Sequence, residues 1–105
     1  MLTSVGVAYA YYNISSNRVY AQIEYNLVLI VESQSGSNVV LLATLKDKTS
    51  PVIDVAVKFY MSTTGEPNSY SLVETKYTDT SGNARITYSA IVNGYYYFIA
   101  TYDVP

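Results

Sequence analysis

The chain has 105 residues, 13 of them Tyr, with no Cys, no His and a net charge of −2. The absence of Cys and His excludes disulfides, zinc–thiolate sites and any reaction that uses a thiol or an imidazole. The cations are scattered instead of forming the clustered basic patch that nucleic-acid binding needs, and no apolar run approaches the roughly 20 residues of a membrane-spanning helix.

The first predicted strand covers residues 3–12, where larger apolar residues alternate with small ones. A period of two is typical of a β-strand, and the small residues would let one face lie close against a neighbouring sheet. The Asn- and Ser-rich residues 13–17 predict a turn or hinge, so we divide the chain into an N-terminal strand with its hinge (1–17) and a sandwich domain (18–105). Asn13-Ile14-Ser15 is a sequon, which makes Asn13 a candidate N-glycosylation site.

The next segment, residues 18–32, is apolar at every second position over a length that is unusual for one strand. We therefore expect it to bend, twist or switch sheets partway. Residues 33–38 predict a loop. Residues 39–46 are apolar on both faces at their start, which indicates a central strand, and residues 47–51 predict a turn.

Alternation continues through Ile53, Val55, Val57 and Phe59, which predicts a half-buried strand. Residues 63–69 form the longest polar connection, and the polar stretch 70–77 predicts an edge strand. Two further strands follow. The predicted core consists of the apolar faces of 39–45, 53–59, 84–90 and 96–102. With no helical periodicity, the sequence predicts an all-β sandwich of about seven strands.

Several short motifs between residues 39 and 102 resemble the bacterial immunoglobulin-like repeats of invasin- and intimin-type surface proteins. Transthyretin-like and carboxypeptidase-regulatory-like domains share much of this pattern. The matching motifs are Ala43-Thr-Leu-Lys-Asp47, Pro51-Val52, Val57-Lys-Phe59, Thr78-Asp-Thr-Ser-Gly-Asn-Ala84 and Gly94-Tyr-Tyr-Tyr-Phe-Ile-Ala100. The resemblance implies an immunoglobulin-like sandwich and says little about activity, because such sandwiches host many functions. It also implies that Tyr96 closes a loop-to-strand corner, with its hydroxyl bonded to the backbone.

The chain departs from those repeats at both ends: a strand precedes the matching part, and nothing after Asp103 supplies a last strand. In this it resembles donor-strand filament subunits, such as chaperone–usher pilins and the thread filaments of some archaea. That resemblance implies that residues 3–12 enter the next subunit near its 95–102 strand, giving a head-to-tail homopolymer. The implied donor residues are Val5, Gly6, Val7, Ala8, Tyr9, Ala10 and Tyr11. The implied acceptor groove consists of Tyr96, Phe98, Ala100 and Tyr102. An ordinary first strand, paired in cis, remains the alternative.

The carboxylates fall in turns or on outward strand positions, where solvation explains them. Asp47 and Asp79 begin turns, where capping of the backbone suffices. A calcium site would require three or more converging oxygens, so we predict no catalytic, metal or cofactor site.

These observations predict a non-enzymatic structural or adhesive protein outside the cell, on the cell surface. Its partners would be further copies of itself, with glycans or host and cell surfaces as adhesion targets. Tyr95 and Tyr97 are expected to point away from the core, so a monomeric carbohydrate-binding module is the main rival. A virion structural protein would use the same fold.

Overall fold

The computed structural model describes residues 7–14 and 19–103, with side-chain positions from Tyr25 onward. Within these residues the chain forms strands and no helix. One of the strands has only two residues, and the other seven form two antiparallel sheets packed as a sandwich. The predicted all-β sandwich is therefore confirmed. The strands are β1 (Val7–Ile14), β2 (Val19–Ser35), β3 (Asn38–Asp47), β4 (Ser50–Pro51), β5 (Ala56–Ser62), β6 (Ser71–Tyr77), β7 (Asn83–Ser89) and β8 (Tyr97–Tyr102).

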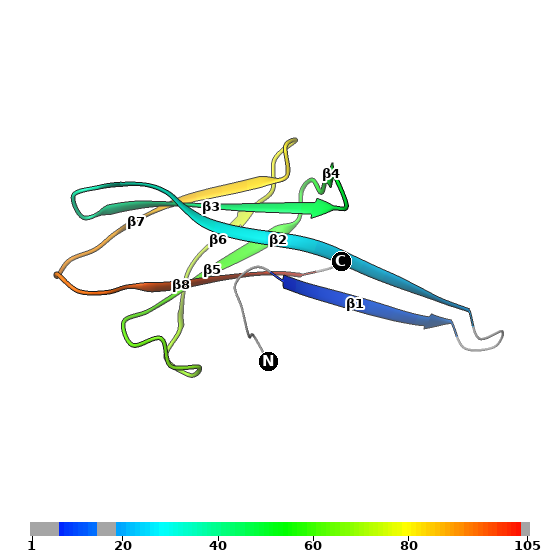
Figure 1. Cartoon of the computed structure of the whole chain (residues 1–105), viewed down its shortest axis with the longest axis horizontal. Coiled ribbons are helices and arrows are strands. Elements are labelled where there is room, and N and C mark those ends of the chain that lie inside the picture. Colours follow the sequence, from blue (N-terminus) through cyan, green and yellow to red (C-terminus); the bar gives the residue numbers. More distant parts are fainter. Residues whose placement is uncertain (1–6, 15–18, 104–105) are drawn as a thin grey trace.

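The two sheets differ in size. The first has the order β1-β2-β3, with β7 and the short β4 both pairing with β3. The second has the order β6-β5-β8. The chain crosses between the sheets after β4, after β6 and after β7, as Figure 1 shows. β3 and β5 are central strands. The apolar run at the start of β3 predicted this position for β3, whereas β5 was predicted only as a half-buried strand.

The core lies between the sheets and is built from the inward positions of β2, β3, β5, β7 and β8. Its largest fully buried apolar side chains are Phe59, Leu27, Leu41, Leu45 and Val57. One predicted core residue is wrong: Ile53 is 52% exposed. Asp54 has a φ of 61°, so the left-handed backbone at this residue interrupts the alternation before Val55. The strand β5 therefore begins only at Ala56.

β2 changes partner partway along its length. Its first part pairs with β1, from Ile14↔Val19 to Val7↔Asn26. Its second part pairs with β3, from Asn26↔Lys46 to Ser35↔Asn38, with a register shift between Val31 and Ser33. The predicted irregularity of this long segment is thus a bulge and a change of partner, and both partners belong to one sheet.

Two predicted boundaries are corrected by the backbone. The strand predicted at 3–12 continues to Ile14 in β1, while its residues 3–6 lie outside the described part. The loop predicted at 33–38 is mostly strand, because β2 reaches Ser35 and β3 begins at Asn38. Gly36, with a φ of 60°, turns the chain there in two residues. A tight turn of this kind needs positive φ, which glycine adopts without strain.

The two ends of the molecule differ. We call β1 together with residues 19–25 of β2 the arm, because this ribbon runs on past the end of β3 (Figure 1). At about 3.4 Å per residue, its β2 half is roughly 24 Å long. The β7–β8 loop (residues 90–96) lies at the opposite end of the longest axis, in a molecule measuring 56 × 31 × 17 Å.

Candidate functional site

The candidate site is the outer edge of β8, which pairs with β5 on its other side. The amide of Asp103 donates to the carbonyl oxygen of Ala56 at 3.4 Å. This bond shows which alternate residues of β8 direct their backbone groups toward β5. In an antiparallel pair, every second residue turns its N–H and C=O toward the partner strand. Phe98 and Ala100 lie an odd number of positions before Asp103, so their backbone N–H and C=O groups face away from β5. No strand of the described residues pairs with them there.

β8 also lacks the charges that usually protect edge strands. β6, the opposite edge of the same sheet, carries Glu74 and Lys76, whose charged groups lie 3.9 Å apart. β7, an edge of the other sheet, carries Arg85. By contrast, residues 86–102 contain no charged side chain. Charges and prolines on edge strands prevent unwanted pairing with other chains, so β8 is better suited than β6 or β7 to accept another strand.

The side chains of this edge join it to the core. Ala100 and Tyr102 are buried, and Phe98 is half-buried against the core cluster. These three predicted acceptor residues share one face of β8. The fourth, Tyr96, precedes the strand, which begins at Tyr97. Their role as an acceptor groove stays a prediction.

β2 and β8 contact each other across the sandwich. From Leu27 onward, β2 pairs with β3 on one side, while β1 ends its pairing at Asn26. The open edges of the two sheets therefore lie on the same side of the sandwich. At the base of the arm, the rings of Tyr25 and Tyr102 lie 5.6 Å apart and the Tyr102 hydroxyl donates to the Tyr25 carbonyl oxygen at 3.4 Å.

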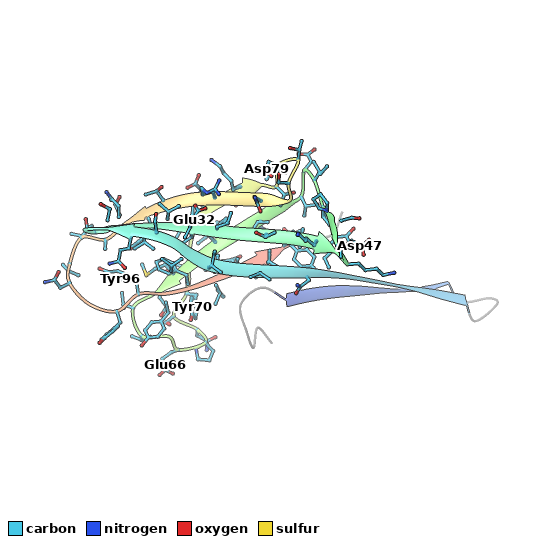
Figure 2. All side chains as sticks on the ribbon, turned by 45° about the horizontal axis from the view of Figure 1, so that its top comes forward. Glu32, Asp47, Glu66, Tyr70, Asp79 and Tyr96 are labelled. Atoms are coloured by element: carbon cyan, nitrogen blue, oxygen red, sulfur yellow. The ribbon has the colours of Figure 1, made fainter. Side chains whose placement is uncertain are left out.

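Tyr96 closes the loop before β8, as the resemblance implied. Its hydroxyl donates to the carbonyl oxygen of Val92 at 2.6 Å, and its ring lies 5.7 Å from that of Tyr88. Tyr88 in turn meets Phe98 edge-on at 5.5 Å. Figure 2 shows Tyr96 at the end of the sandwich far from the arm. The predicted hydroxyl-to-backbone bond is confirmed, and it ties the loop to the first residues of β8.

The predicted donor residues lie in the arm, and β1 also contacts β8 of its own chain. Val7, Ala8, Tyr9, Ala10 and Tyr11 belong to β1, whereas Val5 and Gly6 lie outside the described residues. β1 pairs with β2 of its own chain, so it is one strand of a ribbon and not a lone extension. Its other edge pairs with no described strand.

Asn13, the predicted glycosylation site, also lies in β1, opposite Tyr20 near the far end of the arm. Its modification stays a prediction.

The carboxylates are spread over the molecule, as Figure 2 shows for Glu32, Asp47, Glu66 and Asp79. Among the described residues, no three Asp or Glu gather closely enough to hold a metal ion. Arg85 donates to both carboxylate oxygens of Glu32, at 2.6 and 2.9 Å, which lowers the Glu32 pKa and raises that of Arg85. The outer face of the first sheet thus carries a bidentate ion pair that spans β3.

Asp79 caps its turn as predicted. Its Oδ1 accepts hydrogen bonds from the amides of Asn83 and Ser81, at 3.0 and 2.8 Å. These bonds favour the ionised form and hold the Asp79 pKa below its ordinary value. Asp47 is the last residue of β3, before a turn in which Lys48 has a φ of 59°. The capping role of Asp47 stays a prediction.

The two tyrosines of the rival prediction are exposed to different degrees. Tyr95 is 84% exposed, while Tyr97 is 45% exposed because its ring lies against Gly65. Sequence reasoning missed two neighbours, Ile91 and Val92, which are 95% and 67% exposed. The sequence feature that could have revealed these two residues is the uncharged stretch 86–102. It is longer than the strands within it, so it also includes the loop between β7 and β8.

Comparisons with protein-family models, curated proteins and solved structures found no match. None of the residues that the structure describes forms a helix able to cross a membrane.

Proposed function

We propose that the protein is a structural subunit of an extracellular filament or surface assembly, whose copies join by adding a strand to the edge of β8. The observation that carries the proposal is that the backbone groups of Phe98 and Ala100, in an uncharged stretch of the chain, face away from β5 and pair with no described strand. Main-chain hydrogen bonds would supply affinity, and alternate apolar side chains would set the register. Adhesion to glycans or to host and cell surfaces would be a further role of the assembled subunits.

The donor in this proposal is β1 of a neighbouring copy. Residues 1–17 contain no charged side chain, which makes them a suitable partner for an uncharged edge. Because the far edge of β1 is open among the described strands, β1 can pair with β8 of a neighbour while it keeps its bonds to β2. Donor and acceptor are different surfaces, so the contact is heterologous and propagates into a thread unless it closes into a ring.

Tyr95 supports a second candidate function, a monomeric carbohydrate-binding module. At 84% exposure its ring is free to stack on a sugar. Loss of glycan binding in Tyr95→Ala and Tyr97→Ala variants of a protein that remains monomeric would favour this second function. A virion structural protein would present the same edge, and the source of the particles would distinguish it from a cell-surface filament.

The proposal is tested by electron microscopy and light scattering of the purified chain. We expect threads from the full chain and none after deletion of residues 1–12. Appending residues 1–12 after Pro105 should give soluble, self-complemented monomers. Ordered threads from the truncated chain, or a full chain that stays monomeric at all concentrations, would overturn donor-strand assembly.

A pair of single substitutions identifies the acceptor edge. Ile99 faces outward on β8, opposite Tyr60, and Leu72 is 55% exposed on β6. A lysine on an edge strand opposes pairing with another chain. We expect Ile99→Lys to abolish thread formation and Leu72→Lys, on an edge that is already charged, to leave it unchanged. Equal assembly of both variants would contradict the role of β8.

A further inference from the structure

Asn93 and Gly94 are neighbours in the β7–β8 loop, and both are exposed. They form the only Asn-Gly pair in the chain. An asparagine followed by glycine is chemically labile, because no side chain on the glycine keeps its backbone nitrogen away from the asparagine carboxamide. Asparagine is accordingly one of the thermolabile residues of proteins. The pair therefore marks a position where the chain can modify itself.

Neither of the two reacting groups is held by a hydrogen bond. Within the part of the chain that the structure describes, the Asn93 carboxamide and the Gly94 amide have no partner. A Cβ added at Gly94 would meet no atom within 4 Å, so this amide lies in open space. The loop is fixed around the pair instead, where the Tyr96 hydroxyl donates to the Val92 carbonyl oxygen. The carboxamide and the amide are thus free to react with each other.

The other described asparagines lack this combination. Asn68 is the best comparison, because it is also exposed in a loop and is followed by a small residue, Ser69. The Ser69 amide, however, donates to the carbonyl oxygen of Glu66 at 3.1 Å. All remaining asparagines of the described part lie in the strands β1, β2, β3 and β7. Asn93 is therefore the one whose following amide is both unshielded and unbonded.

We propose that Asn93 is a site of spontaneous deamidation, which gives the chain a new carboxylate. The backbone nitrogen of Gly94 attacks Cγ of Asn93. The new N–Cγ bond replaces the Cγ–Nδ2 bond, and the departing nitrogen takes up the proton of the Gly94 amide and leaves as ammonia. Water then opens the resulting cyclic imide at either of its carbonyl carbons, which yields aspartate or isoaspartate. Water is consumed and ammonia released, with no change of oxidation state.

The product changes the charge of this loop. Residues 86–102 contain no charged side chain, so the new carboxylate ends the neutrality of the stretch and makes the net charge of −2 more negative by one unit. The isoaspartate form also lengthens the backbone between Val92 and Tyr96, inside the loop that their hydrogen bond closes. The conversion accumulates with time, so the charge of the loop would record the age of each chain. It is independent of strand addition at β8 and takes place equally in a chain that stays monomeric.

Trypsin separates the two asparagines for measurement. It cuts after basic residues, and the fragments 86–105 and 59–76 each contain a single side-chain amide, that of Asn93 and that of Asn68. The folded full chain is incubated in mildly alkaline buffer, and mass spectrometry then follows the replacement of amide by acid in each fragment. We expect Asn93 to convert at least about tenfold faster than Asn68. Equal rates at the two positions would overturn the assignment.

The products and two substitutions test the route. Isoaspartate identifies the cyclic imide, because direct hydrolysis of the amide gives aspartate alone. We expect Asn93→Gln to abolish the conversion of fragment 86–105 and Asn68→Gln to leave it unchanged. In denaturant, where the Ser69 amide loses its bond to Glu66, conversion should accelerate more at Asn68 than at Asn93. A folded chain that stays unconverted while the denatured chain converts at Asn93, or conversion without isoaspartate, would overturn the proposal.

Discussion

The Tyr96 hydroxyl donates to the carbonyl oxygen of Val92, four residues earlier, at 2.6 Å. This bond closes the loop that leads into β8. We expect Tyr96→Phe to lower the free energy of unfolding by about 1 kcal/mol, because the ring contact with Tyr88 is kept and only the hydrogen bond is lost. Urea unfolding measures the change. The matched control is Tyr95→Phe, in a side chain that is 84% exposed, and an equal loss there would contradict the assignment.

Gly82 is required by two separate features of its turn. Its φ is 78°, and a Cβ at this position would lie 2.5 Å from the carbonyl oxygen of Leu45. That oxygen belongs to a buried strand and cannot move away easily. We expect Gly82→Ala to destabilise the fold by at least about 2 kcal/mol, since steric overlap adds to the left-handed strain. Thermal or urea unfolding measures the loss.

A substitution at Gly36 measures the backbone strain without the steric overlap. Gly36 has a φ of 60° but no atom within 4 Å of an added Cβ, so Gly36→Ala should cost only the conformational strain, about 1 kcal/mol. Equal losses of unfolding free energy in Gly36→Ala and Gly82→Ala would mean that steric overlap with the Leu45 carbonyl oxygen contributes nothing.

Thr78 satisfies a buried backbone group. Its Oγ1 accepts a hydrogen bond from the amide of Val55 at 3.0 Å, and Thr78 is 4% exposed. Thr78→Val keeps the shape and leaves that amide without an acceptor, so we expect a loss of about 1–3 kcal/mol in the free energy of unfolding. Thr78→Ser keeps the hydroxyl and should lose less. A serine variant as unstable as the valine variant would show that packing of the methyl group dominates.

Two carboxylates make stability depend on pH in the acid range. The pKa of Asp79 is lowered from 3.8 by backbone hydrogen bonds, and that of Glu32 is lowered from 4.5 by its bond to Arg85. A carboxylate with a lowered folded-state pKa stabilises the fold fully above its ordinary pKa. That stabilisation is lost as the pH falls through the folded-state value. We therefore expect stability to decline from about pH 5 downward.

The variants Asp79→Asn and Glu32→Gln test this origin. Each removes one titrating group, so each should flatten the decline in unfolding free energy measured by urea titration between about pH 5 and pH 2. The effect of Glu32→Gln should also shrink in high salt, because its partner Arg85 is solvent-exposed. An unchanged slope in both variants would place the acid sensitivity elsewhere.

Local alternation was sufficient to predict the sandwich and most of its core. Val57, Phe59, Ala84 and Ala100 are buried because a strand turns every second residue inward. Ile53 continued the same pattern but lies beyond a left-handed residue, Asp54, and no apolar period can reveal a positive φ.

The candidate site depended on relationships that are distant in sequence. The neutrality of residues 86–102 can be read directly, but the position of β8 at a sheet edge follows from the whole strand order. The pairing of β1 with β2 likewise depends on a choice between partners, which alternation does not encode. Glu32 and Arg85 are 53 residues apart in sequence, and only the folded sheet brings them together.

The continuity of β2 has a mechanical consequence. One uninterrupted strand belongs to the arm up to Asn26 and to the sandwich from there to Ser35. Tension on the arm along this strand would therefore pull β2 lengthwise past β3. Because the ladder hydrogen bonds lie across the strands, such a pull loads them all at once in shear, whereas peeling would break them one by one. A subunit linked through its arm would resist stretching most strongly along the axis of that one strand.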